Sequence, residues 1–407
     1  MTSIDLDKLP PFVKTDKKGD YTFRTIESGF MSNLDLTNRI FRSMISNKTG
    51  NIVSIAPAKS LPNDDFVRLG SEVRATEIIE GTMINLFWND DKWNIATKNS
   101  VGGDYFFFRN QYYPGLPEPE QKTFRQMFVD GLCPNSSIDI GNFANSTMDV
   151  GNFANSINLS HNRCYSFVVQ HPSNHIVIPV EVPTVYLTCC YEINDMSYTY
   201  VDVFSLKKQF ENTRVKFPRV FNNAAPQRDA IENAFSDEDD GVYRPELIDA
   251  IAKNPLNSYK IPGIMVTHLE TGLRTSFANV KYIEVKLLRG NNSSLHYQYL
   301  MLRKIEKVAE FLQYFPQYRA HFNLFCEHFD TYATRIHKLY LNIHVLKIAK
   351  LDEIEDKRDK YHIAKLHYEH FIPALKAFKQ SSDTIKPKIT RKMVVKYLDS
   401  EKIMIHM

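Results

Sequence analysis

The periodicity of apolar residues changes near residue 292 of this 407-residue chain. Before that point, runs such as NIVSIAPAKS, EIIEGTMINLFW and HIVIPVEVP are rich in β-branched and aromatic residues, which favour strands. Beyond it, Leu300, Leu302, Ile305, Val308 and Leu312 fit the helical period of about 3.6 residues. The sequence therefore predicts an α+β fold, in which an antiparallel-sheet body is followed by an all-α C-terminal domain.

Shifts in composition divide the chain into three predicted parts. Residues 1–50 form an N-terminal segment packed on the body, residues 51–291 form the body, and residues 292–407 form the helical domain. Clusters of Asn, Asp, Pro and Ser predict loop insertions in the body near 135–160 and 222–258. A helix is also expected around Asp35 to Ile45, before the first strands of the body.

An octapeptide is repeated within the first of these insertions. The sequence DIGNFANS at Asp139–Ser146 is followed by DVGNFANS at Asp149–Ser156. Two copies are too few for a repeat architecture, which needs about three. The pair is interpreted as a local duplication that lengthened a surface loop, and a small binding motif is the alternative.

The charge of the chain is distributed unevenly. Residues 292–407 hold 20 Lys and Arg against 13 Asp and Glu, although the whole chain carries a net charge of only +3. A basic helical domain could contact RNA, DNA or an acidic partner. A solvated helical surface with excess lysine is the alternative.

The five cysteines and the N-terminus bear on the cellular compartment. No CxxC spacing occurs, which favours reduced intracellular thiols over a zinc site or a disulfide framework. The first residues, MTSIDLDKLPPF, lack the apolar segment of a signal peptide, and no run of about 18 apolar residues is present. We therefore expect a protein that is not secreted and has no membrane span.

Six short segments carry a recognisable order along the chain. They are APAK with Lys59, IIEG with Ile78 and Glu80, TKNS with Lys98, YSFVVQHP with Val168, PGIMV with Pro262, and SFANVKY with Ser276 and Ala278. In order and spacing they resemble motifs of the RNA ligase branch of the covalent nucleotidyltransferases, and most closely the ligase-like proteins of large DNA viruses. The resemblance covers roughly residues 20–300, and the helical region also resembles the C-terminal domains of those viral proteins. It implies a nucleotidyltransferase body of the ATP-grasp-like RNA ligase type.

The resemblance also implies which positions would carry the family's chemistry. In the family, the lysine of a K-x-D-G motif attacks the α-phosphate of ATP, while carboxylates and further cations hold the metal, the sugar and the phosphates. The nucleophile position falls on Ile78, whose alkyl side chain cannot attack phosphorus. Two carboxylate positions fall on Val168 and Pro262, and two cationic positions fall on Ser276 and Ala278.

These losses predict an inactive pocket. Removing even one such group typically lowers the rate by orders of magnitude. We therefore predict no catalytic residue, no metal site and no cofactor. The vestigial nucleotide pocket would comprise Lys59, Ile78, Glu80, Lys98, Val168, Pro262, Ser276 and Ala278.

Alternative interpretations exist for several of these residues. Ile78 and Val168 are read as strand core residues, which agrees with the loss of catalysis. For Lys59, Glu80 and Lys98 the alternative to a vestigial ligand contact is an internal salt bridge or a solvated charge. His171 is interpreted as a turn residue, because no carboxylate partner is evident from the sequence.

Two function classes follow from this pattern. The first is a catalytically inactive ligase-like protein, a pseudoenzyme that serves as a structural or nucleic-acid-binding component of a large DNA virus. It would reside in the virion, at the capsid, or in a viral factory in the host cytoplasm, with other viral proteins as partners and RNA or DNA bound through the basic helical domain. The alternative is an active ATP-dependent RNA ligase or other nucleotidyltransferase that uses a displaced lysine such as Lys59, with ATP and Mg as cofactors.

Overall fold

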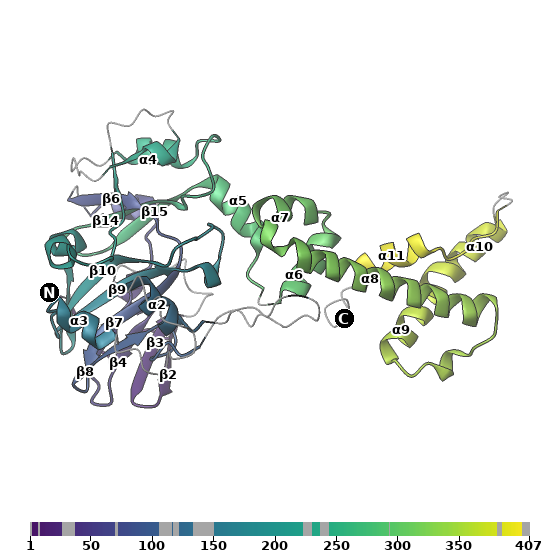
Figure 1. Cartoon of the computed structure of the whole chain (residues 1–407), viewed down its shortest axis with the longest axis horizontal. Coiled ribbons are helices and arrows are strands. Elements are labelled where there is room, and N and C mark those ends of the chain that lie inside the picture. The colour runs from purple at the N-terminus through teal and green to yellow at the C-terminus, as the bar shows by residue number, and fades with distance from the viewer. Residues whose placement is uncertain are drawn as a thin grey trace. The chain divides into compact units, whose positions relative to one another are not determined.

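The computed structural model of the chain divides into two compact units (Figure 1). The residues that the structure describes are 2–6, 9–26, 37–69, 72–105, 116, 122–132, 150–222, 230–236, 244–292, 294–380 and 385–400. The division between the sheet-containing body and the helical unit falls between Leu287 and Leu288, within helix α5 (Val280–Arg289). The sequence places the boundary slightly later, at residue 291. Among the described residues, no helix is both long enough and apolar enough to span a membrane.

The largest sheet of the body has six antiparallel strands. Their spatial order is β1-β11-β10-β9-β7-β8. The bounds are β1 Thr2–Ser3, β7 Thr82–Asn89, β8 Lys92–Ala96, β9 Arg163–Gln170, β10 Thr184–Asn194 and β11 Ser197–Val201. The predicted hairpin is confirmed, since β7 pairs with β8 around Asp90 and Asp91, both of which adopt positive φ angles.

A four-stranded antiparallel sheet is built mainly from the first fifty residues. It comprises β2 (Val13–Lys18), β3 (Tyr21–Ile26), β4 (Met44–Ser46) and β5 (Ile52–Ile55) in chain order. The expected helix around Asp35 to Ile45 is only the short 3-10 helix η2 (Thr37–Arg42), because the chain enters β4 directly after it. The N-terminal segment is therefore part of the sheet architecture of the body.

A five-stranded antiparallel sheet completes the body. Its order is β13-β12-β6-β14-β15, and helices α1 and α4 supply apolar residues to its core. The bounds are α1 Asn63–Val67, β6 Val73–Glu77, β12 Val220–Phe221, β13 Phe235–Ser236, α4 Pro245–Ala252, β14 Gly263–His268 and β15 Arg274–Ala278. The sequence correctly predicted the helix within RPELIDAIAKN, which becomes α4.

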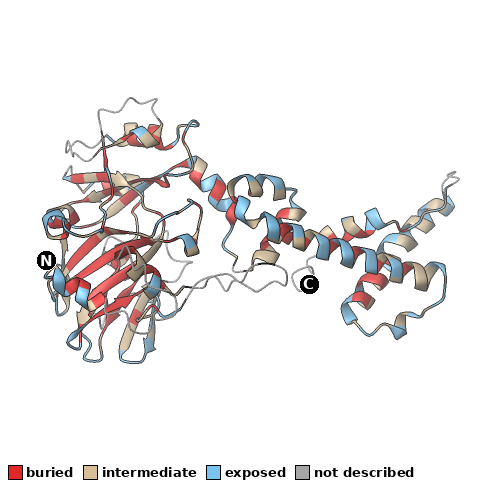
Figure 2. Ribbon diagram, in the orientation of Figure 1, coloured by how far each residue is buried: buried red, intermediate tan, exposed pale blue. Residues whose placement is uncertain are grey.

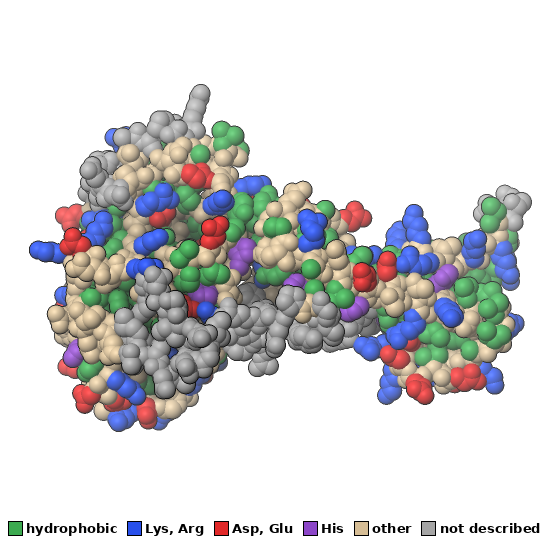
Figure 3. Space-filling model, in the orientation of Figure 1, with side chains coloured by type: hydrophobic (Ala, Val, Ile, Leu, Met, Phe, Trp, Pro, Cys, Tyr) green, Lys and Arg blue, Asp and Glu red, His purple; other side chains and the backbone are tan. Residues whose placement is uncertain are grey.

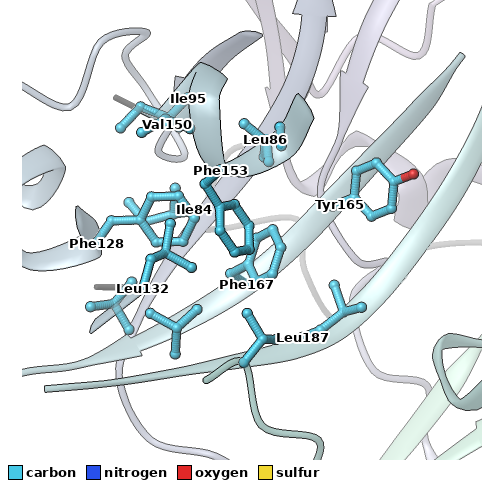
Figure 4. Close-up of a cluster of buried hydrophobic side chains, with 14 of the residues drawn as sticks. Ile84, Leu86, Ile95, Phe128, Leu132, Val150, Phe153, Tyr165, Phe167 and Leu187 are labelled. Atoms are coloured by element: carbon cyan, nitrogen blue, oxygen red, sulfur yellow. The ribbon is translucent and has the colours of Figure 1, made fainter. Parts of the chain in front are cut away.

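The six-stranded sheet has a hydrophobic core on each face. Ile84, Leu86 and Phe167 pack against helices α2 (Phe124–Leu132) and α3 (Val150–Ser156) in the cluster drawn in Figure 4. On the opposite face, Phe87 and Tyr191 pack with apolar residues of β3, β4 and β5. Strands β7, β9 and β10 are therefore buried over most of their length (Figure 2).

Two adjacent cysteines of β10 point to opposite faces of the sheet, as successive strand residues do, and a bulge just before them sets which face each one takes. The register between β10 and β9 shifts between Leu187 and Cys189. Cys189 consequently joins the core that faces the four-stranded sheet, and Cys190 joins the core beneath α2 and α3. The four cysteines that the structure describes are free thiols.

The helical unit confirms the predicted change of period. Its longest helix is α8 (Arg319–Tyr340), which buries Phe322, Phe325 and Phe329 along one face. The other helices are α6 Leu295–Lys304, α7 Val308–Tyr314, α9 Lys357–Lys365, α10 Ile372–Gln380 and α11 Arg391–Ser400. Two short π-helical segments, η8 (Leu341–Val345) and η10 (Leu366–Phe371), follow α8 and α9.

The loop interpretation of the octapeptide repeat is wrong for its second copy. Residues Val150–Ser156 form α3, and Val150, Phe153 and Ala154 are buried in the core. The apolar residues of VGNFANS lie at helical spacing, so packing against β8 stabilises a helix where composition suggested a loop. The first copy, Asp139–Ser146, and the acidic run Asp237–Asp240 lie outside the described residues.

Candidate functional site

Three of the predicted site positions meet at one end of the five-stranded sheet. The amide of Ile78 donates to the carbonyl of Gly263 at 2.9 Å, directly after β6. Gly263 pairs with Ala278 across β14 and β15, and the carbonyl of Pro262 accepts from the amide of Asn279 at 2.9 Å. Ile78 is half-buried beyond the end of β6, so it is not the strand core residue that the sequence suggested.

Glu80 lies beside this sheet end and accepts three hydrogen bonds. One carboxylate oxygen accepts from the amides of Val177 and Ile178, at 3.0 and 2.8 Å. The other accepts from the hydroxyl of Tyr282 at 2.7 Å. Burial, together with the negative charge and hydrogen bond of Glu80, raises the pKa of that hydroxyl. Glu80 therefore links the end of β6 to the segment of Val177 and Ile178 and to Tyr282 of α5, as a hydrogen-bond acceptor. Among the described residues it does not form the internal salt bridge that the sequence offered as an alternative.

Gly81 brings Val168 next to this network. A Cβ atom at Gly81 would lie 2.7 Å from Cγ1 of Val168 and 2.4 Å from the carbonyl oxygen of Val169, and its φ angle is +156°. Val168 is buried in β9, as predicted, and pairs with Met83 and Tyr186. Apolar packing thus occupies the position where the resemblance implies a carboxylate.

The remaining predicted residues, Lys59 and Lys98, belong to a different group of side chains. We call Arg39, Arg42, Lys59, Lys98 and Arg274 the cationic cluster, because each of the other four disfavours the charge of Lys59. Among the described residues, no carboxylate pairs with Arg42, Lys59, Lys98 or Arg274. On the face drawn in Figure 3, lysine and arginine side chains lie beside aspartate and glutamate side chains in several places.

Backbone carbonyls hold the cationic cluster in place. Arg39 donates through Nη1 to the carbonyl of Ser60 at 2.5 Å, and Arg274 donates through Nε to that of Ala58 at 2.8 Å. The amide of Lys59 donates to the carbonyl of Arg39 at 3.1 Å. The short segment that carries Lys59 is therefore fixed from both sides, while the ammonium group of Lys59 makes no hydrogen bond within the described residues.

The electrostatics of the cationic cluster disfavour its own charge. Burial lowers the pKa of Lys59, and the charges of Arg42, Arg274, Lys98 and Arg39 lower it further. Burial and Arg274 lower the pKa of Arg42 to about 10. Burial also lowers the pKa of Arg274. The positive charges of the cationic cluster repel one another, and a bound anion would offset that repulsion.

The sequence did not identify Arg39, Arg42 or Arg274 as site residues. Arg274 lies on β15 two residues before Ser276, so the two share a face of the strand. The resemblance assigns cations to Ser276 and Ala278, both exposed and neutral here. No motif surrounds the three arginines, and only the fold brings Arg274 of β15 near Arg39 and Arg42 of η2.

His171 has a carboxylate partner that the sequence did not reveal. Its Nε2 lies 3.1 Å from a carboxylate oxygen of Asp130, while Nδ1 accepts from the amide of Ser173 at 3.0 Å. Burial alone would raise the pKa of Asp130, but hydrogen bonds from His171 and Lys122 outweigh it and lower that pKa. The buried imidazole caps the turn at Pro172, which agrees with the turn role predicted for it.

The donor set of this region fits phosphate better than a divalent metal. Among the described residues, no group of three or more His, Cys, Asp or Glu side chains could hold a metal ion. Glu80, the one acid among the predicted site residues, already accepts three hydrogen bonds within the body. Guanidinium and ammonium groups, in contrast, are the usual ligands of phosphate oxygens.

Comparisons with known proteins give similarity at the level of solved structures. No protein-family model matches the chain, and no curated protein matches its sequence. A Naegleria gruberi RNA ligase mutant with ATP and Mn is 12% identical, with a TM-score of 0.33 over 56% of this chain and 58% of that one. An apo mutant of the same ligase is 13% identical, with a TM-score of 0.31 over 54% of this chain and 53% of that one. A putative ATP-dependent DNA ligase from Aquifex aeolicus is 10% identical, with a TM-score of 0.35 over 91% of this chain and 78% of that one.

These matching structures are RNA and DNA ligases of the nucleotidyltransferase class. The chain spans less than two thirds of the Naegleria ligase in the two matches given. At TM-scores below 0.5 the similarity establishes neither an activity nor a ligand for this chain. Its chemistry therefore follows from its own side chains.

Proposed function

We propose that this protein is a ligase-like binding protein that has lost covalent nucleotidyl transfer and binds a phosphate-bearing ligand at the cationic cluster. The observation that carries the proposal is the gathering of Arg42, Lys59 and Arg274 without a carboxylate partner among the described residues. Burying unpaired charges destabilises a fold. A phosphate group would supply the missing counter-charge and accept charge-assisted hydrogen bonds.

The loss of catalysis is supported by the side chains at the sheet end. Ile78 has no nucleophilic atom, and Val168, Pro262, Ser276 and Ala278 carry no charge. Glu80 is committed to Tyr282 and to two backbone amides. The apolar side chains of Val168 and Pro262 suit their buried positions, because an unpaired charge there would be more destabilising than a hydrocarbon side chain.

Covalent labelling tests the loss of catalysis. The full chain is incubated with α-labelled ATP or GTP and Mg²⁺ or Mn²⁺, and then separated on a denaturing gel. We expect no labelled protein. A labelled adduct would overturn this part of the proposal.

One observation favours a second candidate function, covalent transfer through Lys59. Burial and four neighbouring cations lower the pKa of its ammonium group, which favours the nucleophilic neutral amine. In that case an adduct forms in the labelling experiment, disappears in Lys59→Arg and persists in the exposed control Lys48→Arg. ATP and a metal ion would then be cofactors, as in the alternative drawn from the sequence.

Ligand titration tests the binding function. Calorimetric titration of the full chain with ATP, and separately with inorganic pyrophosphate, is expected to give binding that Lys59→Ala weakens about tenfold, as for loss of one charge-assisted hydrogen bond. Lys48→Ala, an exposed lysine outside the cationic cluster, serves as the control. Absence of binding for both ligands at low salt would contradict the proposal.

The biological setting rests on the resemblance to proteins of large DNA viruses. It supports a role as a structural or binding component of virus particles or viral factories, together with other viral proteins. The basic composition of the helical unit supports RNA or DNA as a further partner. Immunodetection of the protein in purified particles tests the setting, and its absence there would limit the role to the infected cell.

A further inference from the structure

The body carries a second basic feature, separate from the cationic cluster. A groove of about 620 Å³ lies where β10 and η5 (Val203–Phe210) meet the segment that leads into β12. Its lining includes Tyr186, Lys207, Lys216, Phe217 and Arg219. None of the predicted site residues lines it.

The segment along this groove is strongly basic. Residues 203–219 contain five Lys and Arg and a single acidic residue, Glu211. Lys207, Lys208, Arg214 and Lys216 are exposed, and among the described residues none of them pairs with a carboxylate. Exposed cations spaced along one segment are better suited to bind an extended polyanion than a single compact anion.

One basic residue of the groove has a structural role. Arg219 donates from Nε and Nη2 to the same carboxylate oxygen of Glu77, at 3.0 and 2.7 Å, and its guanidinium lies over the ring of Phe235. This pair fixes the wall of the groove next to β6. Lys207 and Lys216 are therefore the cations of the groove that remain available to a ligand.

Aromatic rings share the lining of the groove with these cations. Tyr186 and Phe217 are half-buried in the groove lining. Phe204 supports Lys207, whose ammonium group lies 4.8 Å from the ring centroid. Cations and aromatic rings in one groove are characteristic of surfaces that hold the backbone of a single strand and stack its bases. A duplex keeps its bases paired and has no free base to stack on these rings.

We propose that this groove binds single-stranded nucleic acid, with phosphates on Lys207 and Lys216 and a base against Tyr186 or Phe217. The proposal does not depend on the cationic cluster, which would take a compact phosphate group. It also assigns nucleic-acid binding to the body, whereas the charge of the sequence suggested the helical unit. Tyr186 pairs with Val168, so a strand in the groove would pass next to the emptied site.

Fluorescence anisotropy with a labelled twelve-nucleotide oligo(U) tests the proposal on the full chain. We expect a Kd that rises with salt, because binding releases counterions from the phosphates. The double variant Lys207→Glu and Lys216→Glu should weaken binding at least about tenfold and reduce the salt slope by about 1.4, the value for two lost phosphate contacts on a single strand. Phe217→Leu should weaken binding at least about fivefold through lost stacking.

Controls separate this groove from other basic surfaces. Lys14→Glu with Lys48→Glu changes charge equally on the four-stranded sheet and should leave binding within about twofold. Lys59→Ala should leave oligonucleotide binding unchanged, and the groove variant should leave pyrophosphate binding unchanged, so failure of one proposal does not imply failure of the other. The groove proposal is overturned if the double variant binds the oligonucleotide as tightly as the original protein, or if duplex RNA competes equally well.

Discussion

Glu80 lies where the resemblance implies an acid, and its carboxylate accepts three hydrogen bonds within the fold. Two of its donors are the amides of the neighbouring residues Val177 and Ile178, and the third is the hydroxyl of Tyr282, which lies far from them along the chain. The side chain is buried, so every lost hydrogen bond would leave a charged oxygen without water. Glu80 thus stabilises the fold through contacts that a catalytic acid would have had to keep free.

Removal of the Tyr282 hydroxyl should expose this dependence. Tyr282→Phe leaves one oxygen of Glu80 unsatisfied and is expected to lower the free energy of unfolding by about 1–3 kcal/mol. Tyr297→Phe, which removes a hydroxyl with no hydrogen bond to the described residues, should change it by less than about 0.5 kcal/mol. Urea denaturation measures both, and equal effects would contradict the structural role of Glu80.

The lowered pKa of Lys59 predicts a pH dependence of ligand binding. In the free protein Lys59 loses its proton at a lower pH than an ordinary lysine, because burial and the neighbouring cations disfavour its charge. A bound phosphate restores that charge, so affinity should fall as the pH rises through the lowered pKa. Calorimetry at pH 7 and pH 9.5 tests this, and Lys59→Arg, which stays charged, should bind with a weaker pH dependence.

Individual residues differed in how far the sequence could predict them. The absence of a nucleophile at Ile78 and of a carboxylate at Val168 was predictable directly, because the residue type alone decides whether a side chain can attack phosphorus or hold a cation. The partners of Lys59 were not readable, since Arg42 and Arg274 are separated by more than two hundred residues. The carboxylate partner of His171 was missed for the same reason, as Asp130 reaches it from α2.

At the level of secondary structure, the contact of β14 with β15 depends on a glycine. Gly263 has a φ angle of +148°, and a Cβ atom there would lie 2.2 Å from the carbonyl oxygen of Phe277. Gly263→Ala should therefore lower the free energy of unfolding by about 3 kcal/mol or more. Gly19→Ala should cost only about 1 kcal/mol, because its φ of +59° strains an alanine but nothing lies within 4 Å. Similar losses for both would contradict the steric explanation.

The two π-helical segments of the helical unit meet through a pair of histidines. His344 of η8 and His367 of η10 stack with ring centroids 3.8 Å apart and an interplanar angle of 7°. Burial and His367 lower the pKa of His344 to about 4, and burial lowers the pKa of His367. The hydroxyl of Tyr340 lies 3.3 Å from Nδ1 of His367, so the pair is packed as neutral rings.

This pair predicts loss of stability in mild acid. Between pH 6.5 and about 4 the unfolded chain takes up a proton on His344 that the folded chain refuses, so the free energy of unfolding falls as the pH falls. Partial exposure weakens the effect, and we expect the melting temperature at pH 5 to lie a few degrees below that at pH 7.5. His344→Phe keeps the stacked ring without a titrating group and should reduce the difference, whereas the exposed control His370→Gln should not.

The type of most elements followed from local pattern, and the exceptions have local causes. Strand runs and the long helices have periods that packing reinforces, so β7, β9, β10 and α8 were predictable. The octapeptide at Asp149–Ser156 looked like a loop because Asn, Gly and Ser dominate its composition. Its three buried apolar residues at helical spacing outweigh that composition once β8 provides a surface to pack against.

For the whole molecule, the cationic cluster predicts that a ligand stabilises the fold. A phosphate ligand at about one hundred times its Kd should add about 2.7 kcal/mol to the free energy of unfolding. Differential scanning calorimetry with and without pyrophosphate measures the rise in melting temperature. Sodium chloride at matched ionic strength is the control, and an equal rise in both would contradict specific binding.

The broad organisation of the molecule was predictable because it depends on average composition. The change from sheet to helix near residue 290 is a change of period over many residues, which single substitutions do not obscure. How the first fifty residues join the body was not predictable. Strands β2, β3 and β4 gain their stability from apolar residues on β7 and β10, and no local pattern identifies such distant neighbours.

The alternation of side chains along β10 has a practical consequence for thiol reagents. It directs Cys189 and Cys190 into opposite cores, and burial raises the pKa of Cys189 to about 12 and that of Cys190 well above its ordinary value. Cys326, in the helical unit, is only half-buried. Of these three, maleimide should modify Cys326 first and reach the strand cysteines only when the body opens. The rate of the slow labelling phase would thus report the rate at which the sheet opens, and the measurement needs no ligand.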